Sequence, residues 1–303
     1  MQKKEEYLEF ISGEYPDLKI IKYQANDKGW DNDIVIINES LVFRFPKSEN
    51  VISKVEAEGK LLHLLKKKHP ILQLPDYEYL YQNQMLKCVR YDYLEGRMLG
   101  DISTDSFKNN QENARVLGDF LTKLHSIDPA EADTMDLETL HTFEYWESLY
   151  SSVQQEIFPY LKRMEKDLID SIFRDFLDAL PGYSIKKSII HGDLTASNII
   201  YSEKNGRISG IIDFTDAQLG DPAFDFAGIY WAYGEDFTSE VLSWYQTNES
   251  ADALFKRVQS FYGLQPIFHN LLYAARNGNN MDWEAGIAKL KRLSSVIYKK
   301  RIT

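Results

Sequence analysis

The sequence predicts an α+β protein of two parts, in which a five-stranded antiparallel sheet with one packed helix precedes a mainly helical region. Short apolar segments separated by turn residues occupy the first part. From residue 103 onward the apolar residues recur at helical spacing. A polar connection at residues 92–96 divides the two, so we expect an N-terminal part at 1–91 and a C-terminal part at 97–303.

The composition indicates an ordinary folded protein. The 303 residues are 44% hydrophobic, which is enough for about two domains. The net charge of -11 argues against nucleic acid or an anionic membrane as partner and suits a cationic one. A lone cysteine, Cys88, can form neither an intramolecular disulfide nor a thiolate zinc cluster. With neither a signal peptide nor an apolar run of membrane-spanning length visible, we expect a cytoplasmic protein. We expect it to be a monomer.

The first part alternates strands and turns, apart from two helices. Pro16 ends the first helix, and leucines give the second helix its apolar face. The expected elements are a helix at 3–14, strands at 18–23, 34–38 and 41–45, a helix at 50–68, and strands at 77–81 and 84–91.

The second part is helical except for one hairpin. Asp221 followed by Pro222 predicts a helix N-cap, because proline is favoured at the first helical position. Asp225, one turn later, is expected to accept backbone hydrogen bonds from the loop before the hairpin, which is a structural role. The expected helices span 107–126, 142–160, 166–180, 237–245, 251–277 and 282–299, and the hairpin strands span 198–201 and 207–212.

The loop before this hairpin carries the residues that indicate chemistry. It reads H-G-D-L-T-A-S-N from His191 to Asn198, and the second hairpin strand ends at Asp213 in I-I-D-F. The order H-x-D-x-x-x-x-N and then D-F is the signature of protein kinases. Phosphoryl transfer requires an oriented acceptor hydroxyl and neutralised phosphate charge. We therefore predict Asp193 as the catalytic base, Asn198 and Asp213 as Mg²⁺ ligands, and His191 as a structural residue.

The same signature predicts nucleotide-binding residues upstream. Gly29 lies in a turn where a kinase places its phosphate loop. Arg44 on the third strand and Glu58 on the next helix match the order of the phosphate-binding cation and its partner, although that cation is usually lysine. Arginine also binds phosphate, and Lys47 is a nearby alternative. The connection between the two parts would hold the purine, and its candidate residues are Arg90, Tyr91, Asp92 and Tyr93.

Together these segments resemble the aminoglycoside phosphotransferase family, most of all the 2''-aminoglycoside phosphotransferases and the macrolide 2'-kinases. The resemblance rests on G-W-D-N at 29–32, V-F-R-F-P-K at 42–47, the loop at 191–198 and I-I-D-F-T-D-A-Q-L-G-D-P-A-F-D-F-A at 211–227. It implies a two-lobed, protein-kinase-like fold with ATP or GTP bound between the lobes. It also implies Asp193 as base and Mg²⁺ bound by Asn198 and Asp213.

The residues expected to bind the acceptor depend on whether the acceptor is cationic or apolar. A polycationic aminoglycoside requires several carboxylates in the C-terminal lobe, and Arg276 there would oppose one. A macrolide would instead require a wide apolar wall. The acceptor-binding candidates are Asp216, Glu235, Asp236, Glu240 and Tyr273, with Glu144 and Glu147 as further acids, and the aromatic candidates are Phe261, Tyr262, Phe268, Tyr273 and Trp283.

We therefore expect a kinase that transfers the γ-phosphoryl group of ATP or GTP to a hydroxyl of an aminoglycoside. The alternatives are a macrolide 2'-phosphotransferase and a kinase of an endogenous metabolite. A nucleotide-binding pseudokinase is disfavoured because Asp193, Asn198 and Asp213 are all present. A protein kinase is disfavoured because neither an A-P-E segment nor a long activation loop follows Asp213.

Overall fold

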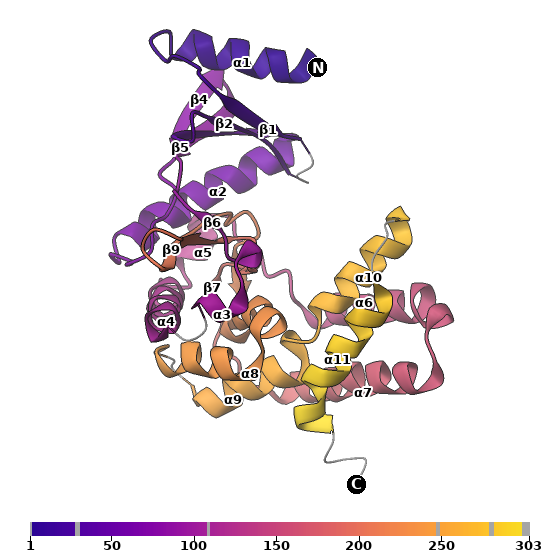
Figure 1. Cartoon of the computed structure of the whole chain (residues 1–303). Helices are drawn as coiled ribbons and strands as arrows, with labels where there is room; N and C mark the ends of the chain where they lie inside the picture. The colour runs from indigo at the N-terminus through magenta and orange to yellow at the C-terminus, as the bar shows by residue number, and fades with distance from the viewer. Residues whose placement is uncertain (1, 28–30, 108–109, 247–248, 279–281, 299–303) are drawn as a thin grey trace.

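The protein has two lobes, seen at the top and bottom of Figure 1. The computed structural model describes residues 2–27, 31–107, 110–246, 249–278 and 282–298. The upper lobe is an antiparallel sheet in the order β1-β2-β3-β5-β4. The helices α1 and α2 lie on opposite sides of this sheet. The N-terminal elements are α1 (Gln2–Glu14), β1 (Tyr23–Asn26), β2 (Asn32–Ile37), β3 (Leu41–Pro46), α2 (Glu49–Lys66), β4 (Glu78–Gln82) and β5 (Met85–Asp92).

The first strand begins later than the sequence predicted. Residues 18–22 have no regular structure, and β1 starts at Tyr23. The reason is the side chain of Asn38, whose Oδ1 accepts hydrogen bonds from the backbone N–H groups of Ile21 and Lys22. Its Nδ2 donates to the carbonyl of Lys19. Because one side chain satisfies these backbone groups, the segment needs no strand partner.

Helix α2 connects the two lobes. Ser48 caps its N-terminus by accepting a hydrogen bond from the N–H of Val51. The first turns pack on the sheet through Val51 and Val55, whereas Leu61 and Leu65 belong to the large core of the C-terminal lobe. Because α2 packs on both lobes, it fixes where its charged side chains lie relative to each of them.

The C-terminal lobe is mainly helical, with two small sheets in the orders β6-β8-β9 and β10-β7. Its strands are β6 (Arg97–Met98), β7 (Ser188–Ile190), β8 (Ile199–Ser202), β9 (Arg207–Ile211) and β10 (Gln218–Gly220). Its helices are α3 (Thr104–Phe107), α4 (Gln111–His125), α5 (Glu131–Thr134), α6 (Phe143–Glu156), α7 (Arg163–Ala179), α8 (Ala227–Ser243), α9 (Ala251–Arg257), α10 (Pro266–Asn277) and α11 (Trp283–Tyr298).

Several predicted helices have different bounds. The helix expected from 107 begins at Gln111, because the Asn110 side chain caps it by accepting from the N–H of Glu112. The helix expected at 251–277 is interrupted by a π-helical turn at Val258–Tyr262, and α10 restarts with Pro266 at its first position. Helix α8 begins ten residues before the predicted start at 237 and changes direction at Gly234, where φ is 81°.

The lobe cores are apolar, and Cys88 is completely buried in the sheet. Asp221 caps the 3₁₀ helix η4 (Pro222–Phe226) by accepting from the N–H of Ala223, which confirms the predicted N-cap. Across the described ranges, none of the helices combines the length and apolar character needed to cross a bilayer.

Candidate active site

The H-G-D segment turns sharply after β7, and this turn requires glycine. Gly192 has φ +80°, a conformation that side chains disfavour. A Cβ there would lie 2.0 Å from the carbonyl oxygen of Asp216. The close approach brings the loop of Asp193 against the segment that follows Asp213, so the two halves of the predicted motif meet in space.

The carboxylate of Asp225 stabilises this turn by accepting the backbone hydrogen bonds that the sequence predicted. Its carboxylate accepts the backbone N–H groups of His191 at 2.8 Å and Gly192 at 3.0 Å. His125 Nε2 lies 3.0 Å from the same carboxylate. Burial alone would raise the pKa of Asp225, but the hydrogen bond with His125 and the charges of His125 and His191 lower it below its usual value.

Replacing Asp225 with alanine is expected to destabilise the fold by roughly 3–5 kcal/mol, because the N–H groups of His191 and Gly192 and the buried ring of His125 lose their acceptor. Urea unfolding followed by tryptophan fluorescence measures this. Asp236→Ala removes an exposed acid from α8 and is the matched control. A loss for Asp225→Ala no larger than that of the control would show that the loop does not depend on this carboxylate.

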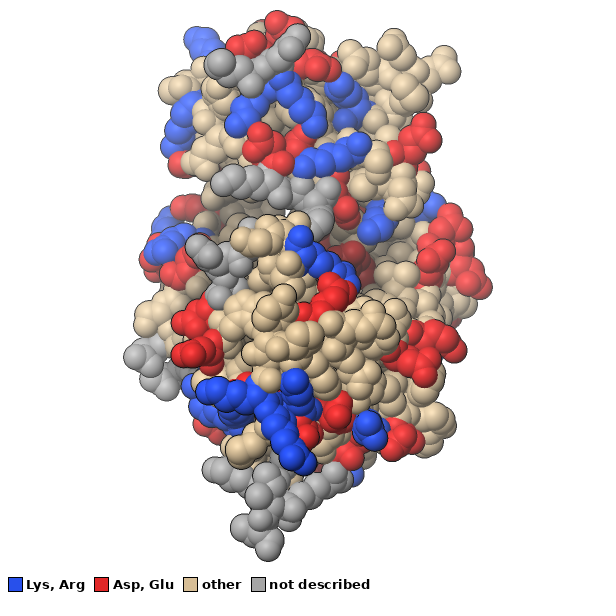
Figure 2. Space-filling model, turned by 90° about the vertical axis from the view of Figure 1, so that its right-hand side faces the viewer, with Lys and Arg blue, Asp and Glu red and all other residues tan. Residues whose placement is uncertain are grey.

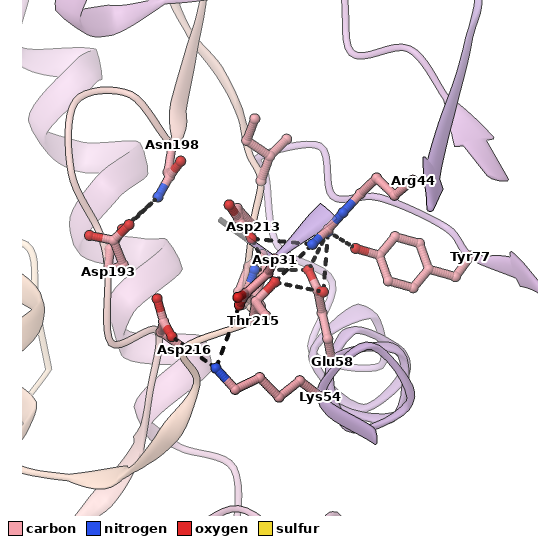
Figure 3. A network of polar contacts seen from close by, with 12 residues as sticks. Asp31, Arg44, Lys54, Glu58, Tyr77, Asp193, Asn198, Asp213, Thr215 and Asp216 are labelled. Carbon is pink, nitrogen blue, oxygen red and sulfur yellow. Dashed lines mark hydrogen bonds and ion pairs between the residues drawn. The ribbon is translucent and has the colours of Figure 1, made fainter. Parts of the chain in front are cut away.

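Asp193 and Asn198 face one another across the loop (Figure 3). Asn198 Nδ2 donates to Asp193 Oδ2 at 2.9 Å and to the Asp193 carbonyl at 2.8 Å. Burial raises the pKa of Asp193 to about 6, and the carboxylates of Asp216 and Asp213 contribute to this rise. The side chain is thus mostly ionised at neutral pH and basic enough to accept a hydroxyl proton.

Asp213 stands at the end of the hairpin in a left-handed backbone conformation, with φ 65°. Aspartate tolerates this region better than most residues do. Its Oδ1 accepts a hydrogen bond from Thr215 Oγ1 at 2.7 Å and lies 3.3 Å from Arg44 Nη2. Burial would raise the pKa of Asp213, but Arg44 and Thr215 lower it below its usual value, so the group stays ionised.

Arg44 and Glu58 form the ion pair that the sequence predicted. Arg44 Nη1 lies 3.0 Å and 3.2 Å from the two carboxylate oxygens of Glu58. The pair is buried, and Glu58 also accepts the N–H of Phe214 at 2.9 Å. Sequence reasoning missed two further partners of Arg44, which are Thr215 Oγ1 at 2.8 Å and the hydroxyl of Tyr77. No spacing in the sequence indicates either contact, because Thr215 and Tyr77 lie far from Arg44 along the chain.

A second cation missed from the sequence lies beside this network. Lys54 projects from α2 between two carboxylates, with its Nζ 3.5 Å from Asp31 Oδ2 and 3.7 Å from Asp216 Oδ1 (Figure 3). Burial raises the pKa of Asp216, whereas Lys54 acts to lower it. Arg44 and Lys54 thus each bring a cation to the site, from neighbouring elements.

The residues present fit a magnesium ion bound together with a nucleotide. The hydrogen bond of Asn198 to Asp193 uses its amide nitrogen, so its oxygen points away from Asp193 (Figure 3). The Asp213 side chain is half exposed and offers a second oxygen donor. Within the described ranges there is no cluster of three or more His, Cys, Asp or Glu side chains that could hold a metal. Two protein oxygens suit Mg²⁺, which takes its remaining ligands from phosphate and water.

The residues predicted to hold the purine lie at the end of β5, where the lobes join. Arg90 forms ion pairs with Asp92 and with Glu78. The ring of Tyr91 is buried, and the backbone N–H of Tyr93 donates to the Ser40 carbonyl, so that group is already satisfied. Gly29 lies outside the described residues.

A cavity of about 640 Å³ opens beside Asp193. Figure 2 shows the molecule hollowed between its two lobes, with acidic side chains in the hollow. Histidines and aromatic residues contribute to the cavity wall, together with small and polar residues. Residues that line it include Asp193, Asp216, His141, Tyr145, Trp231 and His269.

Most of the predicted acceptor residues are not among the described residues that line this cavity. Of the predicted acids, Asp216 lines the cavity, whereas Glu235, Asp236 and Glu240 are not among the described lining residues, and neither is Tyr273. Trp231 precedes the change of direction at Gly234, and the three acids follow it. The acidic candidates of α6, Glu144 and Glu147, are likewise not among the described lining residues.

The structure also places Arg276 and two of the aromatic candidates. Arg276 pairs with Glu156 at 2.6 Å and is not among the described residues that line the cavity. Phe261 and Phe268 cannot form an apolar wall, because both are completely buried. Phe261 stacks on Phe176 with the ring centroids 3.8 Å apart, which places it in the helical core.

Comparisons with known proteins agree with this geometry. The model of the phosphotransferase enzyme family (APH) matches residues 22–257. An uncharacterized protein of Bacillus subtilis (strain 168), YcbJ, is 26% identical over 241 residues, which are 73% of this chain and 74% of that protein. The viomycin phosphotransferase of Streptomyces vinaceus is 30% identical over 152 residues, 47% of this chain and 48% of that enzyme.

Two solved structures illustrate the similarity of fold. The GDP complex of aminoglycoside 2'-phosphotransferase-IIIa has a TM-score of 0.80 and 24% identity, covering 96% of this chain and 98% of that one. The macrolide 2'-phosphotransferase MphH from Brachybacterium faecium has a TM-score of 0.68 and 20% identity, covering 94% and 97%. The chain therefore belongs to the phosphotransferase enzyme family and has its two-lobed, protein-kinase-like fold.

Proposed function

We propose that this protein is a magnesium-dependent kinase that transfers the γ-phosphoryl group of ATP or GTP to a hydroxyl of a small molecule. The observation that carries the proposal is the convergence of Asp193, Asn198 and Asp213 (Figure 3), with Asp193 lining the cavity. A base, an amide oxygen and a carboxylate in this arrangement are what phosphoryl transfer requires of the protein.

In this proposal the acceptor hydroxyl lies in the cavity and donates its proton to Asp193. Asn198 fixes the orientation of the Asp193 carboxylate through its hydrogen bond at 2.9 Å. Magnesium, when bound with the nucleotide, would neutralise phosphate charge and be held by Asn198 and Asp213. Arg44 and Thr215 orient Asp213, because each contacts its Oδ1. The purine would lie near Tyr91, Asp92 and the backbone at the lobe junction.

An aminoglycoside is the first acceptor that we propose. The support is the resemblance at 191–198 and 211–227 and the similarity of fold to a solved kanamycin complex of APH(2'')-IIIa, with a TM-score of 0.79. Asp216 is the carboxylate available for an ammonium group of such an acceptor.

A macrolide is the second candidate, and the wall of the cavity favours it. Tyr145, Trp231 and two histidines line the cavity, and burial lowers the pKa of His141 to about 4 and also lowers that of His269. Both rings are therefore neutral at pH 7. Of the described lining residues, the only carboxylates are Asp193 and Asp216. Such a wall suits an acceptor with few positive charges and a broad apolar face.

Turnover with a panel of acceptors tests the proposal. The purified protein is supplied with Mg²⁺ and ATP or GTP, and nucleoside diphosphate release is followed with kanamycin, gentamicin and a macrolide. We expect one donor and one class of acceptor to raise release well above the rate without acceptor. Turnover with the macrolide alone would select the second candidate. No stimulation by any of them would contradict both acceptor classes.

A further inference from the structure

The cation expected to bind phosphate, Arg44, is fully engaged in a buried network. Its side chain is 4% exposed. One guanidinium nitrogen binds Glu58 and Tyr77, and the other binds Asp213 and Thr215. Turning towards a phosphate would leave Glu58 as a buried carboxylate without its cation, which is strongly unfavourable. Arg44 is therefore placed to hold the site together.

In contrast to Arg44, Lys54 is partly exposed and its ion pairs are long. It lies four residues before Glu58 on α2, so both side chains leave the same face of the helix. Its Nζ makes two long ion pairs, at 3.5 Å with Asp31 and 3.7 Å with Asp216, and its side chain is 36% exposed. Pairs this long and this accessible to water are weak. The ammonium group can exchange these partners for a stronger anion without disturbing a buried contact.

Lys54 lies where the proposed function requires the terminal phosphate of the nucleotide. Asp216 follows Asp213, the predicted metal ligand, by three residues, and it lines the acceptor cavity together with Asp193. The terminal phosphate in the proposed function must lie between Asp213 and the acceptor hydroxyl at Asp193. Lys54 therefore reaches this region from the N-terminal lobe, on the side opposite the catalytic loop (Figure 3).

We propose that Lys54 binds the terminal phosphate of the bound nucleoside triphosphate, while Arg44 is a positioning residue for Asp213 and Glu58. This assignment rests on the proposed function. It revises the expectation that Arg44 itself binds the phosphates. When Lys54 leaves Asp216 for the phosphate, the Asp216 carboxylate becomes available to a cationic group of the acceptor. Binding of the triphosphate would thus prepare the acceptor cavity.

Calorimetric titration of nucleotides into Lys54→Met tests the assignment. The probes, each with Mg²⁺, are the diphosphate and the non-hydrolysable β,γ-imido triphosphate of whichever base, adenine or guanine, the wild type prefers. We expect Lys54→Met to raise the Kd of the imido triphosphate by about tenfold or more and to leave that of the diphosphate nearly unchanged. A charge-assisted contact to the terminal phosphate alone produces this difference.

Two further variants sharpen the test. Lys54→Arg keeps the charge, so we expect it to restore the preference for the triphosphate. Lys60→Met removes another lysine of α2, one that contacts the Thr134 carbonyl, and should bind both nucleotides as the wild type does. An unchanged Kd in Lys54→Met, or equal losses for the two nucleotides, would overturn the assignment of Lys54 alone. A wild type that binds neither nucleotide would overturn the proposed function as well.

Discussion

The Asp193→Asn variant is expected to lose roughly 10²–10⁴-fold in kcat, which is the usual contribution of a positioned base. Asparagine keeps the shape of the side chain, and its carbonyl oxygen can still accept the hydrogen bond from Asn198 that Asp193 Oδ2 accepts at 2.9 Å. It cannot take a proton from the acceptor hydroxyl. The nucleotide Kd should stay within about twofold, because Asp193 is not among the predicted metal ligands. Steady-state kinetics with the best acceptor, together with nucleotide titration, measures both values.

Asp216→Asn is the matched control for this variant. Asp216 lines the same cavity, and burial raises its pKa as it does that of Asp193, but Asp216 has no hydrogen bond to Asn198. We expect the control to change the acceptor KM more than kcat. If Asp193→Asn keeps the wild-type kcat, another group accepts the proton and the proposed role of Asp193 is wrong.

Replacing Asp213 with alanine is expected to abolish the dependence of nucleotide binding on magnesium. The predicted metal site has two protein oxygens, and this change removes the charged one. It also leaves Arg44 Nη2 and Thr215 Oγ1 without their shared acceptor. The affinity for the magnesium nucleotide should fall by roughly 100-fold or more, since even partners outside the metal shell contribute 10–100-fold. Titration of the nucleotide with Mg²⁺ and with EDTA measures the effect.

The control is Asp236→Ala, which removes an exposed acid that is not among the described residues lining the cavity. It should keep the difference between the titrations with Mg²⁺ and with EDTA. A similar difference in Asp213→Ala would mean that the metal is held elsewhere.

The parts of the site that the sequence predicted are those encoded by short, ordered segments. The loop from His191 to Asn198 brings Asp193, the predicted base, and the amide of Asn198 together, because the two are five residues apart in one loop. The pairing of Arg44 with Glu58 followed from the order of strand and helix, and the structure confirms it.

The parts that could not be predicted depend on contacts between distant segments. Thr215 meets Arg44 across 171 positions of the sequence, and Lys54 meets Asp216 only because α2 lies against the segment after the hairpin. No spacing in the sequence records either contact. The acids of α8 depend on the path of the backbone: the helix changes direction at Gly234, and none of the three acids after it is among the described residues that line the cavity.

The local errors in the fold have equally specific causes. One side chain, Asn38, satisfies the backbone of residues 19–22, where a strand was predicted. A π-helical turn at Val258–Tyr262 divides a segment whose apolar pattern resembled one continuous helix. Such features depend on individual hydrogen bonds, whereas hydrophobic periodicity reports only the average environment of a segment.

Phosphorus NMR of the complete reaction, with Mg²⁺, the preferred triphosphate and the best acceptor of the panel, shows directly where the phosphoryl group goes. We expect the γ-phosphate signal to be replaced by that of a phosphate monoester on the acceptor, and Asp193→Asn to form this product far more slowly. Inorganic phosphate as the sole product, or monoester formed equally fast by Asp193→Asn, would contradict the proposal that Asp193 drives transfer to a hydroxyl in this cavity.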